Sequence, residues 1–142
     1  LLERVQMRAT KMVDGMGSLD YQTRLEKLGL PTLLYRRNRG DMIEVYKHLN
    51  IYDPDTIPDQ HFKLQNRGSR AHDKKLVWKK PKDGTRGLQS NSFYFRTLQN
   101  WNDLPRSAAH AKTINEFKNE LDDAWREKQF KFNHETTTQS GS

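Results

Sequence analysis

Apolar residues recur every three or four positions in several parts of this chain, and this spacing predicts a mainly α-helical fold of about five helices. Residues 1–13 form the first predicted helix, which is amphipathic. Its apolar side consists of Leu2, Val5, Ala9 and Met12, and its basic side consists of Arg4, Arg8 and Lys11. Asp14-Gly15 is expected to end this helix.

Two further helices are predicted before residue 50. Ser18 is the expected N-cap of a short helix with Tyr21, Leu25 and Leu28 on its apolar side, and Gly29 is its expected left-handed end. Thr32 is the expected N-cap of a third, longer helix. The apolar stripe of this helix is broken and consists of Leu34, Met42, Ile43, Tyr46 and Leu49. Gly40 is expected to interrupt this third helix, because glycine inside a helix lowers stability by roughly 1 kcal/mol relative to alanine.

The middle of the chain carries weaker signals. Residues 51–72 are rich in proline, glycine and polar side chains, which predicts a loop with at most a helical turn from Gln60 to Leu64. Lys75–Trp78 is short and partly β-prone. It could form a short hairpin with a return strand in residues 86–96, but Ser90–Asn102 fits a helix equally well, and the helix is preferred.

The last part of the chain carries the clearest helix signal. On the helix expected before Pro105, the residues predicted to face inward are Phe93, Leu98 and Trp101. Thr113 and Glu116 form a capping box for a final helix reaching about Lys128. The apolar stripe of this helix is Phe117, Leu121, Ala124 and Trp125. Residues 129–142 are polar and are expected to be disordered.

Positive charge is concentrated in one stretch. The net charge is +7, and the basic segment, residues 63–86, accounts for all of it with nine Lys or Arg against two Asp. Because such side chains release counterions when they neutralise phosphates, nucleic acid is the predicted partner. The candidate phosphate contacts are Arg67, Arg70, Lys74, Lys75, Lys79, Lys80, Lys82 and Arg86. Trp78 either stacks on a base or inserts into the core. The lysines could instead form a solvated loop that only keeps the protein soluble.

Composition limits the other possibilities. The length of 142 residues indicates one domain or a piece of a larger one, and the start at Leu1 inside a helical pattern suggests a fragment of a longer polypeptide. A hydrophobic fraction of 33% predicts a thin core. No apolar run is long enough for a membrane span, so no membrane partner is expected. The absence of cysteine excludes disulfides and thiolate metal sites and fits an intracellular location, the nucleus or the cytoplasm.

Catalytic signals are weak. The five histidines show no metal-ligand spacing, and Asp122-Asp123 falls inside a capped helix, where adjacent carboxylates point apart into water. There is no phosphate-binding glycine loop and no glycine-framed serine. We therefore predict no catalytic residue, no bound cofactor and no small-molecule substrate in this chain.

Several segments carry a family resemblance when they are taken together and in order. They are Leu2–Met12, Tyr21, Arg24-Leu25, Leu28–Pro31, Arg36–Lys47, Phe93–Arg96, Trp101–Pro105 and Phe117–Asp122. Across about residues 1–126, the chain resembles the region just after the polymerase core in reverse transcriptases of jockey-like and CR1-like non-LTR retrotransposons. One departure is that Arg67-Gly68 is separated from His72 by three residues, whereas the family usually has a continuous Arg-Gly-His triplet.

The resemblance implies the end of a polymerase thumb with its C-terminal extension. It divides the chain into a thumb-like helical part (1–50), a basic loop or short hairpin (51–88) and a C-terminal helical pair (89–128). It implies binding of RNA or an RNA–DNA hybrid, placed for an upstream polymerase core of the same polypeptide that holds the catalytic aspartates and Mg ions. Further candidate phosphate contacts are then Arg4, Arg8, Lys11, Arg36, Arg37 and Arg39.

Simpler interpretations stay open for these residues. The basic side of the first helix could be a solvated face, and Asp41 and Glu44 could pair with the arginines of Arg36–Arg39 along one helix. The alternative function is a structural module that packs on the polymerase core without touching nucleic acid. The aromatic residues that would make this contact are Tyr46, Phe93, Trp101, Phe117 and Trp125.

Overall fold

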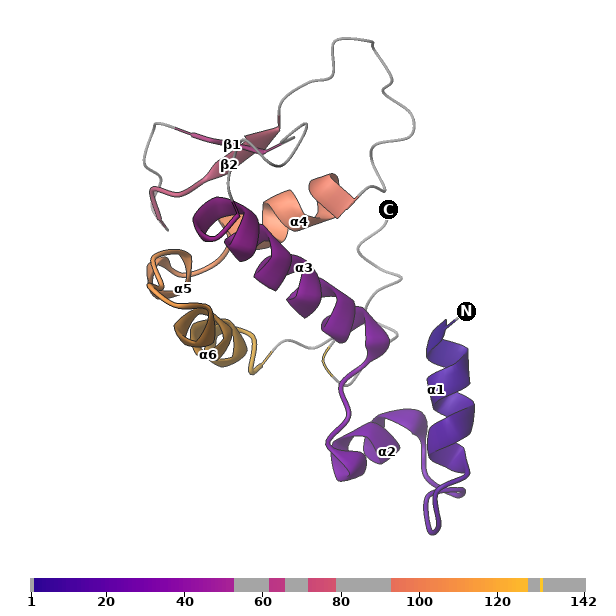
Figure 1. Cartoon of the computed structure of the whole chain (residues 1–142). Helices are drawn as coiled ribbons and strands as arrows, with labels where there is room; N and C mark the ends of the chain where they lie inside the picture. The colour runs from indigo at the N-terminus through magenta and orange to yellow at the C-terminus, as the bar shows by residue number, and fades with distance from the viewer. Residues whose placement is uncertain (1, 53–61, 66–71, 79–92, 128–130, 132–142) are drawn as a thin grey trace, which may run out of the picture. The chain divides into compact units, whose positions relative to one another are not determined.

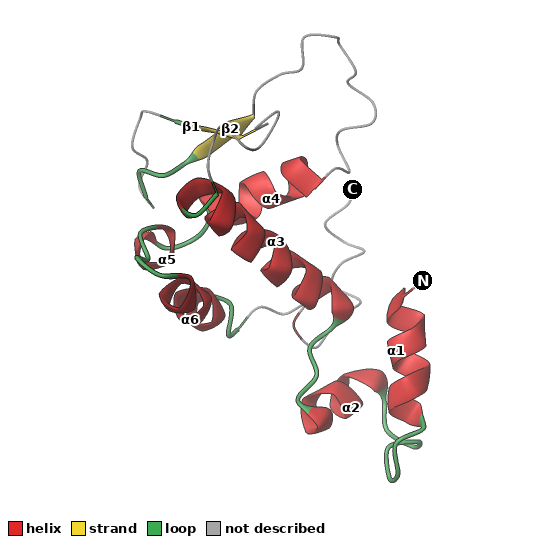
Figure 2. Ribbon diagram, viewed as in Figure 1, coloured by secondary structure: helices red, strands yellow, loops and turns green. Residues whose placement is uncertain are grey.

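The computed structural model describes residues 2–52, 62–65, 72–78, 93–127 and 131, and in these parts the chain is mainly helical, as predicted (Figures 1 and 2). The helices are α1 (Leu2–Lys11), α2 (Tyr21–Leu28), α3 (Leu33–Asn50), α4 (Phe93–Asn102), α5 (Arg106–Ala109) and α6 (Ile114–Ala124). The strands β1 (Phe62–Leu64) and β2 (Leu76–Trp78) form a small antiparallel sheet.

The chain divides into two compact units that share α3. The N-terminal unit comprises Leu1–Arg39 with Arg126–Ser142, and the central unit comprises Gly40–Trp125. This structural division differs from the three segments inferred from the resemblance, which stay predictions. The disordered tail predicted for residues 129–142 lies outside the described residues, apart from Lys131.

A buried arginine joins α1 to α2 in the N-terminal unit. The Arg24 guanidinium donates to the carbonyls of Met7 (3.2 Å) and Leu19, and to the Thr10 hydroxyl (3.2 Å). A buried charge is tolerated when its donors are satisfied, and a cation is also favoured near the C-terminal end of α1. Arg24 is therefore a structural residue of this unit.

Glu3 ties the start of α1 to the start of α3. One of its carboxylate oxygens accepts from the backbone N–H of Leu33 (3.0 Å), where the dipole of α3 favours an anion. The other accepts from the Tyr21 hydroxyl (2.5 Å), which also receives a hydrogen bond from Gln6 (3.1 Å). The side of α1 that packs within the unit therefore carries Glu3, Gln6 and the buried Thr10, and not the apolar stripe.

The ends of α2 follow local signals, with one correction. The N-cap is Asp20 and not the predicted Ser18. The Asp20 carboxylate accepts from both the hydroxyl (2.6 Å) and the backbone N–H (3.0 Å) of Thr23, and these bonds lower the pKa of Asp20. Both residues are good caps, and the extra bond from the Thr23 hydroxyl explains why the later one is used. Gly29 ends the helix with φ 63°, as predicted.

The long helix α3 starts as predicted and runs without a break. The Thr32 hydroxyl accepts from the backbone N–H of Tyr35 (3.1 Å), which is the expected N-cap bond. The helix continues through Gly40, so the predicted interruption there was wrong. The buried residues of α3 are Tyr35, Met42, Val45 and Tyr46, whereas Leu34, Ile43 and Leu49 are half-buried.

Stacked aromatic rings form the core of the central unit. Phe117 of α6 packs on Tyr46 of α3 with ring centroids 4.5 Å apart, and on Trp101 of α4 at 5.8 Å. The Tyr46 hydroxyl donates to the Ala111 carbonyl (2.8 Å), and burial raises the pKa of Tyr46. Trp125 is also buried. Large stacked rings supply much buried area per residue, which suits a chain with few apolar residues.

The small sheet differs from the predicted hairpin. β2 lies where a strand was predicted, but it pairs with β1 and not with residues 86–96. Phe62–Leu64 forms a strand, whereas the sequence predicted a loop with at most a helical turn there. The preferred helix over Ser90–Asn102 is confirmed over Phe93–Asn102 by α4, and its first three residues lie outside the described ranges. Strand pairing depends on residues distant in the chain, so the local pattern gave no information on which segment β2 would meet.

The capping box of α6 is present in a shifted form. The Thr113 hydroxyl accepts from the backbone N–H of Glu116 (3.1 Å), as predicted. The Glu116 carboxylate accepts from the N–H of Lys112 (3.0 Å), one residue before the usual partner. The helix ends at Ala124, earlier than the predicted end at about Lys128. Ala124 is exposed, although it was predicted to belong to the apolar stripe of this helix.

Candidate nucleic-acid interface

The described part of the basic segment is held against the end of α4. The indole N–H of Trp101 donates to the Lys74 carbonyl (2.9 Å). Nε2 of His72 lies 3.2 Å from the Trp101 carbonyl, and because a carbonyl can only accept, Nε2 of His72 is the donor. Residues 72–74 are therefore fixed to α4 by two hydrogen bonds to one tryptophan.

Asn102 extends this attachment to β2. Its side-chain oxygen accepts from the Leu76 backbone N–H (2.8 Å), and its side-chain N–H donates to the Leu76 carbonyl (2.9 Å). An amide side chain can satisfy both groups because it carries the same donor and acceptor as a peptide bond. Asn102 therefore occupies one edge of β2 as a neighbouring strand would.

The other edge of β2 is paired with β1. Leu64 lies opposite Leu76 in the antiparallel register, and the backbone N–H of Gln65 donates to the Lys75 carbonyl (2.7 Å). Leu76 itself is buried. We call the set His72, Trp101 and Asn102 the α4 clamp, because these residues fix the backbone that carries Lys74 and Lys75.

Lys74 and Lys75 have different surroundings within the clamp. The ammonium group of Lys75 donates to the Asn102 carbonyl at the C-terminal end of α4, where a cation is favoured. Lys74 is half-buried and holds Trp101 only through its backbone carbonyl. Lys74 is therefore the better candidate for a phosphate contact, and Lys75 has a structural role in the fold.

Two titratable groups have shifted pKa values here: His72 of the clamp and its neighbour Asp73. Burial lowers the pKa of His72, while the Trp101 carbonyl opposes this shift and the charge of Lys75 adds to it. Next to it, the Asp73 carboxylate hydrogen-bonds His110, and this bond lowers the pKa of Asp73. His72 is thus favoured as a neutral ring, consistent with a core position rather than a phosphate contact.

The basic side chains of α1 and α3 belong to the N-terminal unit. Arg4, Arg8 and Lys11 are all exposed along one side of α1. On α3, Arg36 and Arg37 are exposed, whereas Arg39 is half-buried. The exposed members are accessible to phosphate, which is what the candidate role requires.

Six predicted contacts and one ring cannot be placed. Arg67, Arg70, Lys79, Lys80, Lys82 and Arg86 lie outside the described residues. The same holds for the side chain of Trp78, although its backbone forms the last position of β2. Both predictions for Trp78, base stacking and core insertion, stay open.

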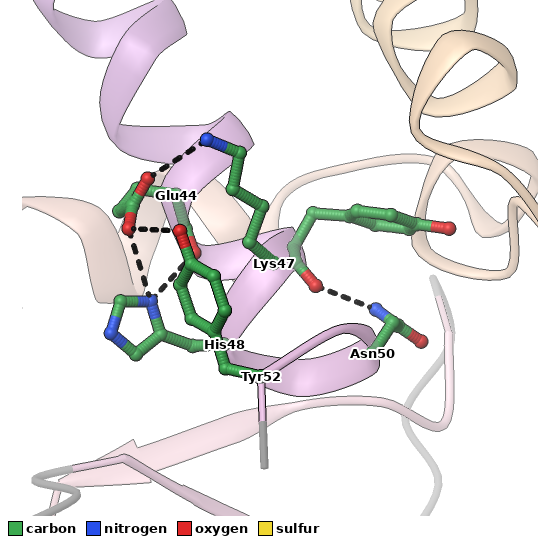
Figure 3. A network of polar contacts seen from close by, with 6 residues as sticks. Glu44, Lys47, His48, Asn50 and Tyr52 are labelled. Carbon is green, nitrogen blue, oxygen red and sulfur yellow. Dashed lines mark hydrogen bonds and ion pairs between the residues drawn. The ribbon is translucent and has the colours of Figure 1, made fainter. Parts of the chain in front are cut away.

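Glu44 does not follow the pairing suggested from the sequence. It turns toward the C-terminal end of α3, where its carboxylate lies 3.4 Å from Nζ of Lys47 and accepts from the Tyr52 hydroxyl (3.1 Å), as Figure 3 shows. His48 hydrogen-bonds the Glu44 carbonyl (2.8 Å), and its ring meets that of Tyr52 edge to face. This half-exposed network closes the end of the helix and contributes little free energy.

Sequence reasoning missed the role of Asn102 and of buried His72. The Trp101-Asn102 pair at a helix end is the local signal, and by itself it does not show which segment these two side chains bond. Nothing local in the sequence indicates that an asparagine will replace a strand, because its partner Leu76 lies 26 positions away.

Other kinds of site find no support in the described residues. Within the described ranges, no group of three His, Asp or Glu side chains is placed to hold a metal ion. No helix in the part of the chain that the structure describes combines the length and apolar character of a membrane span. Searches with this chain against protein-family models, curated proteins and solved structures give no match.

Proposed function

We propose that this chain is a non-catalytic, nucleic-acid-binding segment of a retrotransposon-type RNA-directed DNA polymerase. It would position RNA or an RNA–DNA hybrid for an active site upstream in the same polypeptide. The observation that carries the proposal is the concentration of the whole +7 charge in residues 63–86, joined to a helical core by the α4 clamp. The family resemblance is the second support.

The proposed mechanism is electrostatic positioning. Phosphate contacts fix where a nucleic acid lies but carry no sequence information, so preference for shape rather than sequence is expected. A clamped backbone lowers the entropy that is lost when Lys74 engages a phosphate, since the chain on both sides of it is already fixed. No cofactor is assigned to this chain, and the Mg ions would belong to the upstream core.

The alternative, a structural module without nucleic-acid contact, loses part of its support. Tyr46, Trp101, Phe117 and Trp125 were expected to pack on another body, but they are buried within the chain itself. The side chain of Phe93 lies outside the described residues. Docking through these rings would require unfolding of the core that they form.

The test is fluorescence-anisotropy titration of a labelled RNA–DNA hybrid and a single-stranded RNA at several salt concentrations. We expect affinity to fall steeply as salt rises, with a log–log slope close to the number of phosphate contacts. Replacing Lys74, Lys79 and Lys80 with Ala should reduce that slope by up to about three. Lys75 is left unchanged because its ammonium group bonds the carbonyl of Asn102 at the end of α4.

The matched control removes the same charge elsewhere. The control is a triple variant, Lys27→Ala, Lys112→Ala and Lys118→Ala. Lys27 lies in α2, Lys118 lies in α6, and Lys112 precedes the N-cap of α6. This triple variant should keep the slope of the parent chain. Equal losses in the two triple variants would show that only net charge matters, and absence of binding by the folded chain at low salt would refute the proposal.

A further inference from the structure

The described residues of the N-terminal unit leave an apolar stripe of α1 uncovered, and Met12, just after the end of the helix, continues this stripe. Leu2, Val5 and Met12 are 73%, 61% and 84% exposed. An amphipathic helix of a soluble domain normally buries this stripe. Here the packed side is the polar one with Glu3 and Thr10, because their hydrogen bonds to the rest of the unit set the rotation of the helix.

Most of this stripe lines a groove within the N-terminal unit. The groove has a volume of about 520 Å³ and its walls are almost wholly apolar. One wall is formed by Val5, Ala9 and Val13, and the other by Leu28, Leu30 and Leu33. From Leu2 to Thr10 the groove follows α1 for roughly 12 Å at 1.5 Å per residue, which is about two helical turns, and Val13 lies just beyond the helix.

The rims of the groove are positively charged. At 100° per residue, Arg8 lies about 60° from Val5, next to the outer edge of the groove, whereas Arg4 lies on the far side of α1. Arg36 and Arg37 follow Leu33 by three and four positions, so they lie one turn further along the same side of α3. Arg8, Arg36 and Arg37 are exposed. The acidic residue Glu26 falls on the opposite side of α2 from Leu28 and does not offset them.

We infer that this groove binds an acidic amphipathic helix of another protein segment. A long apolar groove suits the anchors that such a helix presents at positions i, i+4 and i+7, and carboxylates beside these anchors would meet the arginine rims. A nucleic acid would use the rims but would leave the apolar walls exposed to water. The inference goes beyond the proposed function, because it concerns the apolar walls and a different partner. The arginines at the rims are also candidate phosphate contacts, so Val5→Ser, which removes no charge, is the variant that separates the two.

Among the described residues, this chain does not itself offer such a helix. The acidic helix is α6, but its apolar residues Phe117 and Leu121 are completely buried in the central unit. A second copy could therefore supply α6 only by unfolding. This favours a different segment as the partner.

The probe is a designed, fluorescently labelled helical peptide of about 16 residues with Leu at positions i, i+3, i+4 and i+7 and Glu at its flanks. Binding to the full chain is measured by anisotropy at low salt. We expect saturable binding, at least tenfold weaker for a scrambled peptide and for the same peptide with Lys in place of Glu. Val5→Ser should weaken binding at least tenfold, and it should not affect folding because Val5 is exposed.

Two matched controls separate the groove from general stickiness. Met12→Ser removes an apolar side chain of the same region that is even more exposed than Val5 but does not line the groove, and it should leave binding unchanged. Arg8→Glu should weaken binding, whereas Lys112→Glu in the central unit should not. Equal effects of Val5→Ser and Met12→Ser would overturn the inference.

Other outcomes also decide the matter. If the folded chain does not bind the acidic peptide, or binds the Lys peptide equally well, the inference is wrong. A third outcome is that the chain binds vesicles of phosphatidylcholine and phosphatidylserine but not the peptide, and that Val5→Ser abolishes vesicle binding. In that case the groove faces a lipid surface and the proposed partner is wrong. Val5→Ser should leave RNA–DNA hybrid binding intact, so failure here is distinguishable from failure of the proposed function.

Discussion

At the scale of single residues, the fold depends on polar side chains that replace backbone partners. Asn102 bonds both backbone groups of Leu76, the Glu3 carboxylate accepts from the first N–H of α3, and the Arg24 guanidinium donates to the carbonyl of Met7. Each of these bonds is partly or wholly shielded from water, so removing the side chain leaves a backbone group without its partner. Such losses cost more than the bond itself contributes.

Asn102→Ala is expected to lower the free energy of unfolding by about 1–3 kcal/mol, because the N–H and carbonyl of Leu76 lose their partners. Urea denaturation measures this change, and the Leu76 amide should also exchange faster with deuterium. Gln99→Ala, an exposed position on the same helix, is the control and should change stability by less than about 0.5 kcal/mol. Similar losses in the two variants would show that the clamp is not needed.

His72 should make stability depend on pH. Burial lowers the native pKa of His72 below its ordinary value of 6.5, so below that pH the unfolded chain binds the proton more readily. The free energy of unfolding should therefore fall as pH decreases from about 6.5 and should level off below the native pKa. His72→Gln, which keeps a donor for the Trp101 carbonyl, should flatten this dependence. A flat curve for the parent chain would contradict the argument.

At the scale of elements, short-range signals decided where helices begin and end. Gly29, Thr32 and Thr113 could be assigned from the sequence because each bonds to residues only a few positions away. The packed side of α1 could not, since it is set by Glu3 and Arg24 across 30 and 17 positions. The apolar stripe pointed to one rotation of this helix, and the hydrogen bonds selected another.

Gly40→Ala should stabilise the chain by about 0.5–1 kcal/mol. Gly40 lies inside α3 without a positive φ, and an added Cβ would meet no atom within 4 Å, so alanine only removes flexibility from the unfolded chain. Gly29→Ala is the contrasting variant, because its φ of 63° strains any other residue and should destabilise the fold. Thermal unfolding monitored by circular dichroism would show opposite shifts, and a loss of stability in Gly40→Ala would mean that glycine is required within α3.

At the scale of the whole molecule, charge could be predicted better than contact. The concentration of positive charge in residues 63–86 is a property of the sequence alone. The ammonium group of Lys75 bonds the end of α4, whereas the side chain of Lys74 does not. The sequence could not show this difference, because the partner of Lys75 is Asn102, which lies 27 positions later in the chain. The candidate site was thus predicted as a region and not as individual contacts.

The position of Asn102 has a further consequence for behaviour at high concentration. An open strand edge is a template on which strands of other molecules add, and proteins commonly protect such edges with charge, bulges or a covering element. In β2 one side chain gives that protection, since the backbone groups of Leu76 are already bonded on the side away from β1. A chain without this amide would expose a β-prone run, Leu76–Trp78, to edge-to-edge association.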